Sequence, residues 1–162
     1  MKSSSVVINT SPWIALSVCN QVDLLNEVYE NVLIPSAVER EIIAGGKNRP
    51  GARELGEATW LNVMEIQDIT KIFLLHELDR GEGEVIILAQ EQKINQVIID
   101  ERVARMHASV AGLSLMGTLG FLLKSKKQNL IPEIRPLIEK ILQAGIYIHQ
   151  NIVQGILREA GE

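Results

Sequence analysis

The amino-acid sequence predicts a three-layer α/β/α fold around a short, mostly parallel sheet of four to five strands. Short apolar runs rich in Val and Ile alternate along the chain with longer segments of helical periodicity. Strands that are apolar at successive positions are buried on both faces, which requires helices above and below a parallel sheet. Aromatic residues make up only 4% of the chain. The core must therefore come mainly from Ile, Leu, Val and Ala, which favours layered packing over a small β-sandwich.

The size of the chain limits the number of domains. Its 162 residues, of which 46% are hydrophobic, are enough for one domain with a substantial core and too few for two comfortable ones. The sequence also contains no internal repeat, low-complexity tract or linker. We therefore expect a single domain over residues 1–162.

The first strand and helix follow from the N-terminal residues. Segment 6–8 is a β-branched run that predicts a buried strand, which ends at Asn9. Ser11 followed by Pro12 is typical of a helix start, with Ser11 as the cap and Pro12 at the first helical position. A short helix is therefore expected over 13–18.

The same pattern continues through the first half of the chain. Segment 32–34 predicts a second buried strand, and Ser36 is expected to cap a helix over 37–44 that Gly45 and Gly46 stop. The other elements expected here are helices over 22–29 and 51–58, a polar turn over 47–50 and an edge strand over 60–66.

In the second half, helical periodicity predicts helices over 70–78, 82–92, 102–110, 117–127, 134–144 and 151–159. Short apolar runs predict strands over 96–99, 112–116 and 146–148. The strand over 96–99 is closed by Asp100 and Glu101.

The composition limits the classes of function. The formal net charge is −4, so overall charge gives no indication of nucleic-acid binding, although a local basic rim would not appear in the net value. Cys19 is the only cysteine, which excludes an internal disulfide and a Cys-rich zinc site and fits a reducing cytoplasm. No apolar segment approaches the roughly 20 residues of a membrane span. We expect a cytoplasmic protein without membrane association.

Polar side chains occur where the predicted strands end. Asn9 follows the first strand, Asp100 follows the third, Glu41 lies in the helix after the second, and Glu82 begins a helix directly after Gly81. Ligands bind beyond the carboxyl ends of parallel strands, and Mg²⁺ and Mn²⁺ prefer hard oxygen ligands of these types. A metal held at this rim would orient a water and neutralise charge on a phosphoryl group.

Several stretches of sequence, taken in order, carry a family resemblance. They are VVINTSP (6–12), IPSAVEREI (34–42), LDRGEGE (78–84) with ILA (87–89), VIIDE (97–101) with AR (104–105), GTLG (117–120) and the tail 144–162. Together they cover nearly the whole chain, which resembles the PIN-domain ribonucleases and specifically a branch of VapC-like proteins. The resemblance implies a PIN-like fold and a Mg²⁺- or Mn²⁺-dependent endoribonuclease, the toxin of a toxin–antitoxin pair. It also implies RNA as substrate, a cognate antitoxin and a homodimer.

The resemblance also implies a set of site residues. Matched by position, Glu41, Glu82 and Asp100 take the places of the family's catalytic acids, and Asn9 joins them as a metal ligand. The first family acid is normally Asp, so Asn9 removes one negative charge. One charge–charge contact near 4 Å is worth about 4 kcal/mol at an effective dielectric of about 20, before desolvation. We therefore expect weaker metal binding and reduced or lost activity.

Further residues have secondary roles in this interpretation. Thr10, Ser11, Glu84 and Glu101 are expected to support the site. Arg102 and Arg105 share a helix face at a spacing of three and are candidates to contact RNA phosphates.

Simpler interpretations exist for the same residues. Acids at helix starts often act only as caps or dipole partners, which would account for Glu82, and Asn9 lies in a good capping sequence. Glu41 is also compatible with an ordinary surface helix, and Arg102 and Arg105 with ordinary solvated charges.

At the level of the whole chain, the alternative to a toxin nuclease is an inactive PIN-like module that binds RNA or an antitoxin. A third interpretation, another acidic metal-dependent phosphohydrolase, predicts a small-molecule pocket in place of an open groove.

Overall fold

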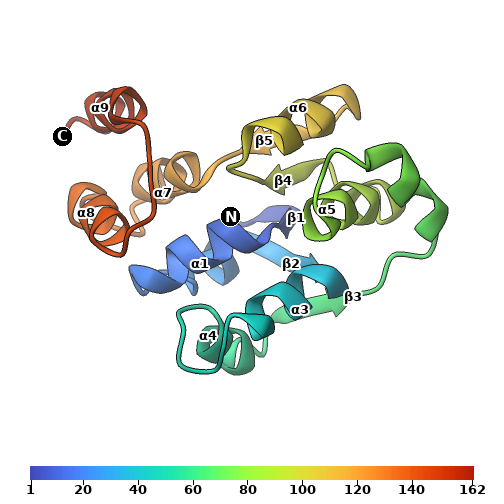
Figure 1. The fold of residues 1–162 in the computed structure, drawn as a ribbon. Helices are drawn as coiled ribbons and strands as arrows, with labels where there is room; N and C mark the ends of the chain where they lie inside the picture. The colour runs from blue at the N-terminus through green and yellow to red at the C-terminus, as the bar shows by residue number, and fades with distance from the viewer.

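The computed structural model describes residues 1–162 and contains a five-stranded, wholly parallel sheet with strand order β3-β2-β1-β4-β5. The strands are β1 (Ser3–Ile8), β2 (Tyr29–Pro35), β3 (Leu61–Met64), β4 (Gln96–Ile98) and β5 (Ser114–Met116). Helices flank the sheet, which gives the three-layer α/β/α architecture that the sequence predicts (Figure 1).

The helices lie close to their predicted positions. They are α1 (Thr10–Val18), α2 (Leu24–Val28), α3 (Ser36–Ala44), α4 (Ala52–Glu57), α5 (Arg80–Glu91), α6 (Arg102–Val110), α7 (Thr118–Lys127), α8 (Arg135–Gln143) and α9 (Gln150–Glu159). In Figure 1, α7, α8 and α9 gather at the side of the molecule that carries the C-terminus. No helix combines the length and apolar character that a bilayer crossing requires.

The core forms where the central strands meet the helices. Val6, Val7 and Ile8 of β1 are fully buried, as are Val97 and Ile98 of β4. A strand in the middle of a parallel sheet is covered on both faces, so its buried positions must be apolar. This burial explains why short all-apolar runs identify the strands in the sequence.

Two predicted elements are wrong. Segment 146–148 is not a strand but part of the loop between α8 and α9. Its alternating pattern arises because Ile146 and Ile148 pack against the core while Tyr147 remains exposed. Segment 70–78 is not an α-helix: its first part belongs to a 3₁₀ helix, η1 (Ile69–Leu75), and its last three residues lie in a turn.

The predicted helix starts are also displaced. Asn9, and not Ser11, occupies the N-cap position of α1, which begins at Thr10. Pro12 still lies in the first turn, where backbone N–H groups have no intrahelical partner, so its missing donor has no effect. Ser36 is the first residue of α3, and Pro35 precedes it at the cap position. Both helices therefore begin directly at the end of their strands.

Candidate active site

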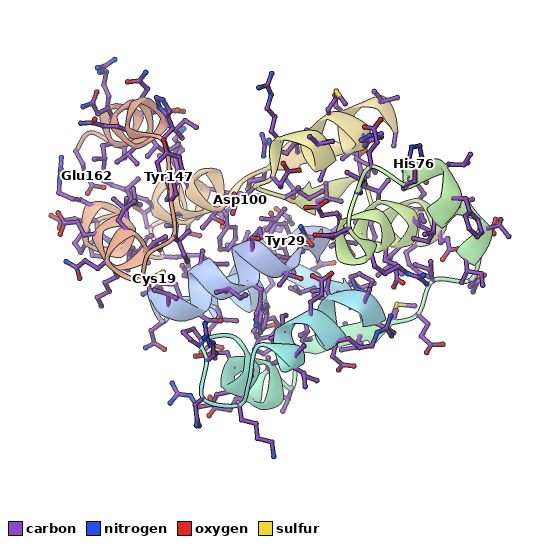
Figure 2. All side chains as sticks on the ribbon, in the orientation of Figure 1. Cys19, Tyr29, His76, Asp100, Tyr147 and Glu162 are labelled. Atoms are coloured by element: carbon purple, nitrogen blue, oxygen red, sulfur yellow. The ribbon has the colours of Figure 1, made fainter.

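The candidate site lies at the carboxyl ends of β1 and β4, in the middle of the sheet. The chain leaves β1 toward β2 and leaves β4 toward β5, so the strand order reverses between these two neighbours. Such a reversal opens a crevice that parallel α/β proteins use for ligands. The Asn9 N–H donates to the Ile98 carbonyl over 3.1 Å, which fixes the end of β1 beside the end of β4. Asp100 lies near the centre of the molecule, where the chain enters α6 (Figure 2).

Asn9 has an unsatisfied side chain. It is 3% exposed, and its Oδ1 is buried without any hydrogen-bond partner. Although Asn9 occupies the N-cap position of α1, its side chain makes no capping hydrogen bond. A buried polar atom without a partner costs about 1–3 kcal/mol. The capping interpretation therefore does not account for this side chain, and its oxygen is available to a ligand.

Glu41 connects α3 to the starts of two other helices. Thr10 Oγ1 of α1 donates to Glu41 Oε2 over 2.6 Å, and the Gly81 N–H of α5 donates to Oε1 over 2.9 Å. Glu41 itself lies in α3. A Cβ atom at position 81 would lie 2.4 Å from Oε1, so only glycine allows this approach. The carboxylate is therefore held in one orientation by donors from two other helices.

Glu82 takes part in a capping box. Its backbone N–H donates to Asp79 Oδ1 over 2.8 Å, and the Asp79 N–H donates to Glu82 Oε2 over 3.3 Å. Burial raises the pKa of Glu82, and the negative charges of Asp79, Glu101 and Glu41 raise it further, while the hydrogen bond from the Asp79 backbone lowers it. Glu82 therefore has the capping role expected of an acid at a helix start. It also lies within electrostatic reach of Glu41 and Glu101.

Asp100 is held by Thr118 at the start of α7. The Thr118 N–H donates to Oδ1 over 2.7 Å, and its hydroxyl donates to Oδ2 over 2.5 Å. Thr118 is 3% exposed, whereas Asp100 is exposed. We did not predict a role for Thr118 from the sequence. The signal was available, because Thr118 lies two residues after the end of the β5 strand, at the same rim as the other site residues.

A family model for the PIN domain matches residues 5–162. The chain belongs to the PIN-domain family. No curated protein matches the chain. Membership of this family gives the protein a nuclease-type fold, and PIN domains generally use divalent metals.

The supporting residues of this PIN domain differ in their roles. Thr10 contacts Glu41 as described, whereas Ser11 is exposed and makes no side-chain hydrogen bond. Glu101 is the N-cap of α6 and accepts from the Ala104 N–H over 2.9 Å. Glu84 is 2% exposed and serves a structural contact. It pairs with Arg80 at 2.5 Å and accepts from the Ala37 N–H over 3.3 Å, which joins α5 to the start of α3.

The two candidate RNA-contact arginines also differ. Arg105 donates to the Ile99 carbonyl over 2.7 Å, so its guanidinium supports the strand end that carries Asp100. Arg102 is exposed, and its side chain makes no hydrogen bond or ion pair. Of these two arginines, only Arg102 has a guanidinium without a partner in the protein.

The acidic side chains do not form a closed metal cage. No three His, Cys, Asp or Glu side chains lie close enough together to hold a metal ion. Mg²⁺ often binds through one or two carboxylates and keeps several waters, and such a site does not need three convergent acids. The unpartnered Oδ1 of Asn9 and the carboxylates of Glu41 and Glu82 are hard oxygen atoms of the required type. The residues present therefore fit a divalent metal at this rim.

Proposed function

We propose that this PIN domain is a Mg²⁺- or Mn²⁺-dependent endoribonuclease of the toxin type that hydrolyses RNA phosphodiesters at the acidic rim. The single observation that carries the proposal is the buried, unpartnered oxygen of Asn9 at the strand-order reversal of a PIN fold. We propose Asn9, Glu41, Glu82 and Asp100 as the metal ligands, directly or through water, and the three acids as the catalytic residues.

The neighbouring groups have defined tasks in this proposal. Thr10 and the Gly81 backbone orient the Glu41 carboxylate, and Thr118 orients Asp100. Such partners of metal-binding carboxylates typically change affinity or activity by 10- to 100-fold when they are removed. The bound divalent ion would supply Lewis-acid activation of a water and charge neutralisation at the phosphoryl group.

The raised pKa of Glu82 adds a chemical capacity. A carboxyl with a raised pKa holds a proton more readily than ordinary glutamate and can donate or accept it near the reacting atoms. The negative charges of Glu41 and Glu101 contribute to this shift. A bound cation would oppose their effect and lower the pKa of Glu82 again.

An RNA-cleavage assay tests the nuclease proposal. The full chain is incubated with structured and unstructured RNA in Mn²⁺ or Mg²⁺, beside Asp100→Asn and a matched surface control, Asp23→Asn. Cleavage that requires metal and disappears only in Asp100→Asn is the expected result. Cleavage that survives Asp100→Asn would show that the activity does not come from this site.

One observation favours a second function. Asn9 replaces a charged ligand and no three acids converge, which would also suit a PIN-like module that binds RNA or an antitoxin without cleaving. The Asn9→Asp variant separates the two proposals. A silent native chain with activity restored in Asn9→Asp would favour the binding module, whereas cleavage by the native chain would exclude it.

The proposed setting is a cytoplasmic toxin–antitoxin pair, with the protein as a homodimer whose antitoxin blocks the acidic rim. Support for a protein partner comes from α6, where Val103, Met106 and Val110 are exposed at helical spacing. Exposed apolar patches of this kind commonly mark protein interfaces. Light scattering of the purified chain tests the dimer, and a charged substitution, Met106→Glu, should shift a dimer toward monomer. A native chain that is monomeric at micromolar concentration would contradict the dimer.

A further inference from the structure

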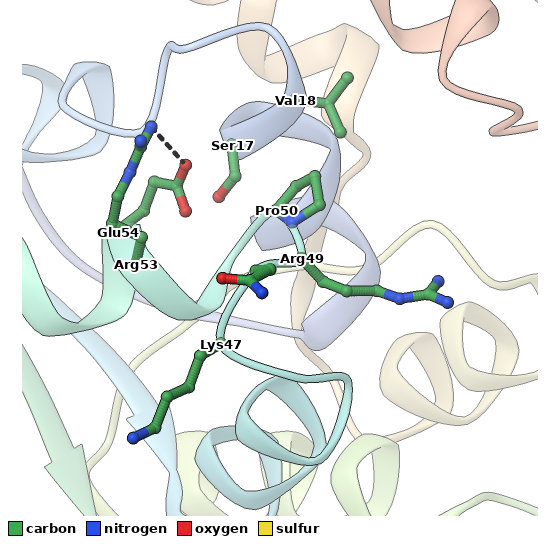
Figure 3. Close-up of a pocket in the computed structure, with 8 residues that line it drawn as sticks. Ser17, Val18, Lys47, Arg49, Pro50, Arg53 and Glu54 are labelled. Atoms are coloured by element: carbon green, nitrogen blue, oxygen red, sulfur yellow. Dashed lines mark ion pairs between the residues drawn. The ribbon is translucent and has the colours of Figure 1, made fainter.

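A polar pocket of about 350 Å³ lies at the end of α1 that is remote from Asn9. Ser17 and Val18 of α1 form one wall, and the loop 47–50 with Arg53 and Glu54 of α4 forms the rest. Figure 3 shows these side chains around the loop that joins α3 to α4. Only one lining residue is hydrophobic, so the pocket suits a polar or charged ligand. We call this feature the basic pocket.

The charges of the basic pocket are mostly positive. Arg53 pairs with Glu54 at 3.7 Å, and the Gly51 N–H also donates to that carboxylate over 2.9 Å. Lys47 and Arg49 are exposed, and neither takes part in any hydrogen bond or ion pair. The cations Lys47, Arg49 and Arg53 and the anion Glu54 together give a local charge of +2. Lys47 and Arg49, which have no partner in the protein, carry this charge.

The directions of these side chains indicate the shape of the ligand. In Figure 3, Lys47 and Arg49 extend from the loop in different directions and do not converge on one point. A compact anion such as a single phosphate would need convergent donors. Two divergent cations instead suit successive charges along a strand.

We propose that the basic pocket binds the sugar–phosphate backbone of an RNA strand whose reacting bond lies at the acidic rim. The inference rests on the proposed function and adds a second contact region to it. Helix α1 connects the two places, because Thr10 at its start contacts Glu41 while Ser17 near its end lines the pocket. The nine residues of α1 span about 13 Å at 1.5 Å per residue. That length corresponds to roughly four nucleotides at about 3.4 Å each.

The net charge of the protein makes such a contact necessary. The chain carries a formal charge of −4, and its acids at the rim repel phosphates. Binding of a polyanion therefore depends on local cations that release condensed counterions from the strand.

A simpler role for the same residues is electrostatic stabilisation of α1. Cations near the C-terminus of a helix interact favourably with its dipole by about 0.3–1 kcal/mol. That role predicts a small loss of thermal stability when the charges are removed and no change in RNA affinity. The two explanations therefore differ in a measurable quantity.

The test is RNA binding by the full chain in metal-free buffer, measured by fluorescence anisotropy with single-stranded 12-mer and 4-mer pools of random sequence. The test variant is Lys47→Gln/Arg49→Gln. Its control is Lys93→Gln/Arg158→Gln, which changes the net charge equally at two exposed sites without hydrogen bonds or ion pairs. Loss of two phosphate contacts should reduce the slope of log affinity against log salt by about 1.4 and weaken 12-mer binding on the order of 25-fold near 0.1 M salt. The 4-mer, whose length only just matches the distance between the two places, should bind the native chain more weakly than the 12-mer.

Each outcome decides the inference separately from the nuclease proposal. Equal 12-mer affinities for the test variant and its control would overturn the inference, even if cleavage still depends on Asp100. Absence of RNA binding by the native chain would overturn it as well. Weakened 12-mer binding by the test variant alone would support it, even if no variant cleaves RNA. Melting temperatures of both variants within about 2 °C of the native value would show that the effect does not arise from a loss of folding.

Discussion

Gly81→Ala tests the arrangement of the acidic rim most directly. The added Cβ would lie 2.4 Å from Glu41 Oε1, about 1.0 Å inside the 3.4 Å of ordinary contact. The obstructing atoms are the far end of a flexible side chain, so we expect the Glu41 carboxylate to swing away and the backbone to stay. This movement breaks the hydrogen bond from the Gly81 N–H, and the site loses one oriented oxygen ligand.

The magnitude of the effect follows from two opposing terms. A hydrogen bond to a charged group is worth about 1.5–3 kcal/mol, and replacing a helical glycine with alanine returns about 0.5–1 kcal/mol. The free energy of unfolding should therefore fall by only about 0.5–2.5 kcal/mol, which lowers the melting temperature by roughly 2–4 °C per kcal/mol. Metal affinity should fall more steeply, by about 10- to 100-fold.

The assay is calorimetric titration with Mn²⁺, combined with thermal unfolding of the metal-free protein. Gly155→Ala in α9 is the matched control, because a Cβ there meets nothing within 4 Å. The control should gain stability and keep the native metal affinity. If Gly81→Ala behaves like Gly155→Ala in both measurements, then Glu41 does not approach Gly81 as described and the reasoning is refuted.

Three further predictions address other parts of the site. Glu84→Ala should lower the free energy of unfolding by about 1–3 kcal/mol in urea titrations, because it removes a buried hydrogen-bonding partner. Glu159→Ala, which removes one side chain of an exposed ion pair, should cost less than about 1 kcal/mol. Equal losses in the two variants would contradict a buried structural role for Glu84. Thr118→Val should weaken Mn²⁺ binding about 10- to 100-fold because Asp100 loses its hydroxyl donor, and unchanged affinity would remove Thr118 from the site. Because the pKa of Glu82 is raised in the fold, protonation stabilises the metal-free protein as pH falls toward about 4.3, and this contribution is lost as pH rises through the folded-state pKa. The Mn²⁺-induced rise in melting temperature should thus grow as the pH rises through the folded-state pKa of Glu82, and Glu82→Gln should reduce this growth.

The sequence predicted the layered fold and its strands because burial constrains each position of a central strand. Val6, Val7 and Ile8 are apolar since both faces of β1 are covered, and this short apolar run stops at a polar residue. The segment 146–148 has the same local pattern but no neighbouring strand to pair with. A local pattern does not encode the presence of a partner, so this prediction was wrong.

The contacts of the candidate site could be predicted less well. Glu82 and Glu84 are two residues apart on α5, so they point to different sides of the helix, with one near the rim and the other toward α3. Composition cannot distinguish the two acids, and only the family spacing selected Glu82. Thr118 and the free charges of the loop 47–50 were missed because their significance depends on residues far away in the sequence.

The buried oxygen of Asn9 bears on both stability and metal binding. An aspartate at this position would place a negative charge beside acids that already raise the pKa of Glu82, and the metal-free fold would be less stable for it. Asparagine avoids this repulsion but leaves its Oδ1 without a partner. A bound ligand would supply that partner. Asparagine in place of aspartate therefore removes one negative charge that would attract a metal. It also removes the repulsion between that charge and the other acids, which a metal would otherwise have to neutralise. For this reason a weaker dependence of folding on metal, rather than an absence of metal binding, is the expected consequence of Asn9.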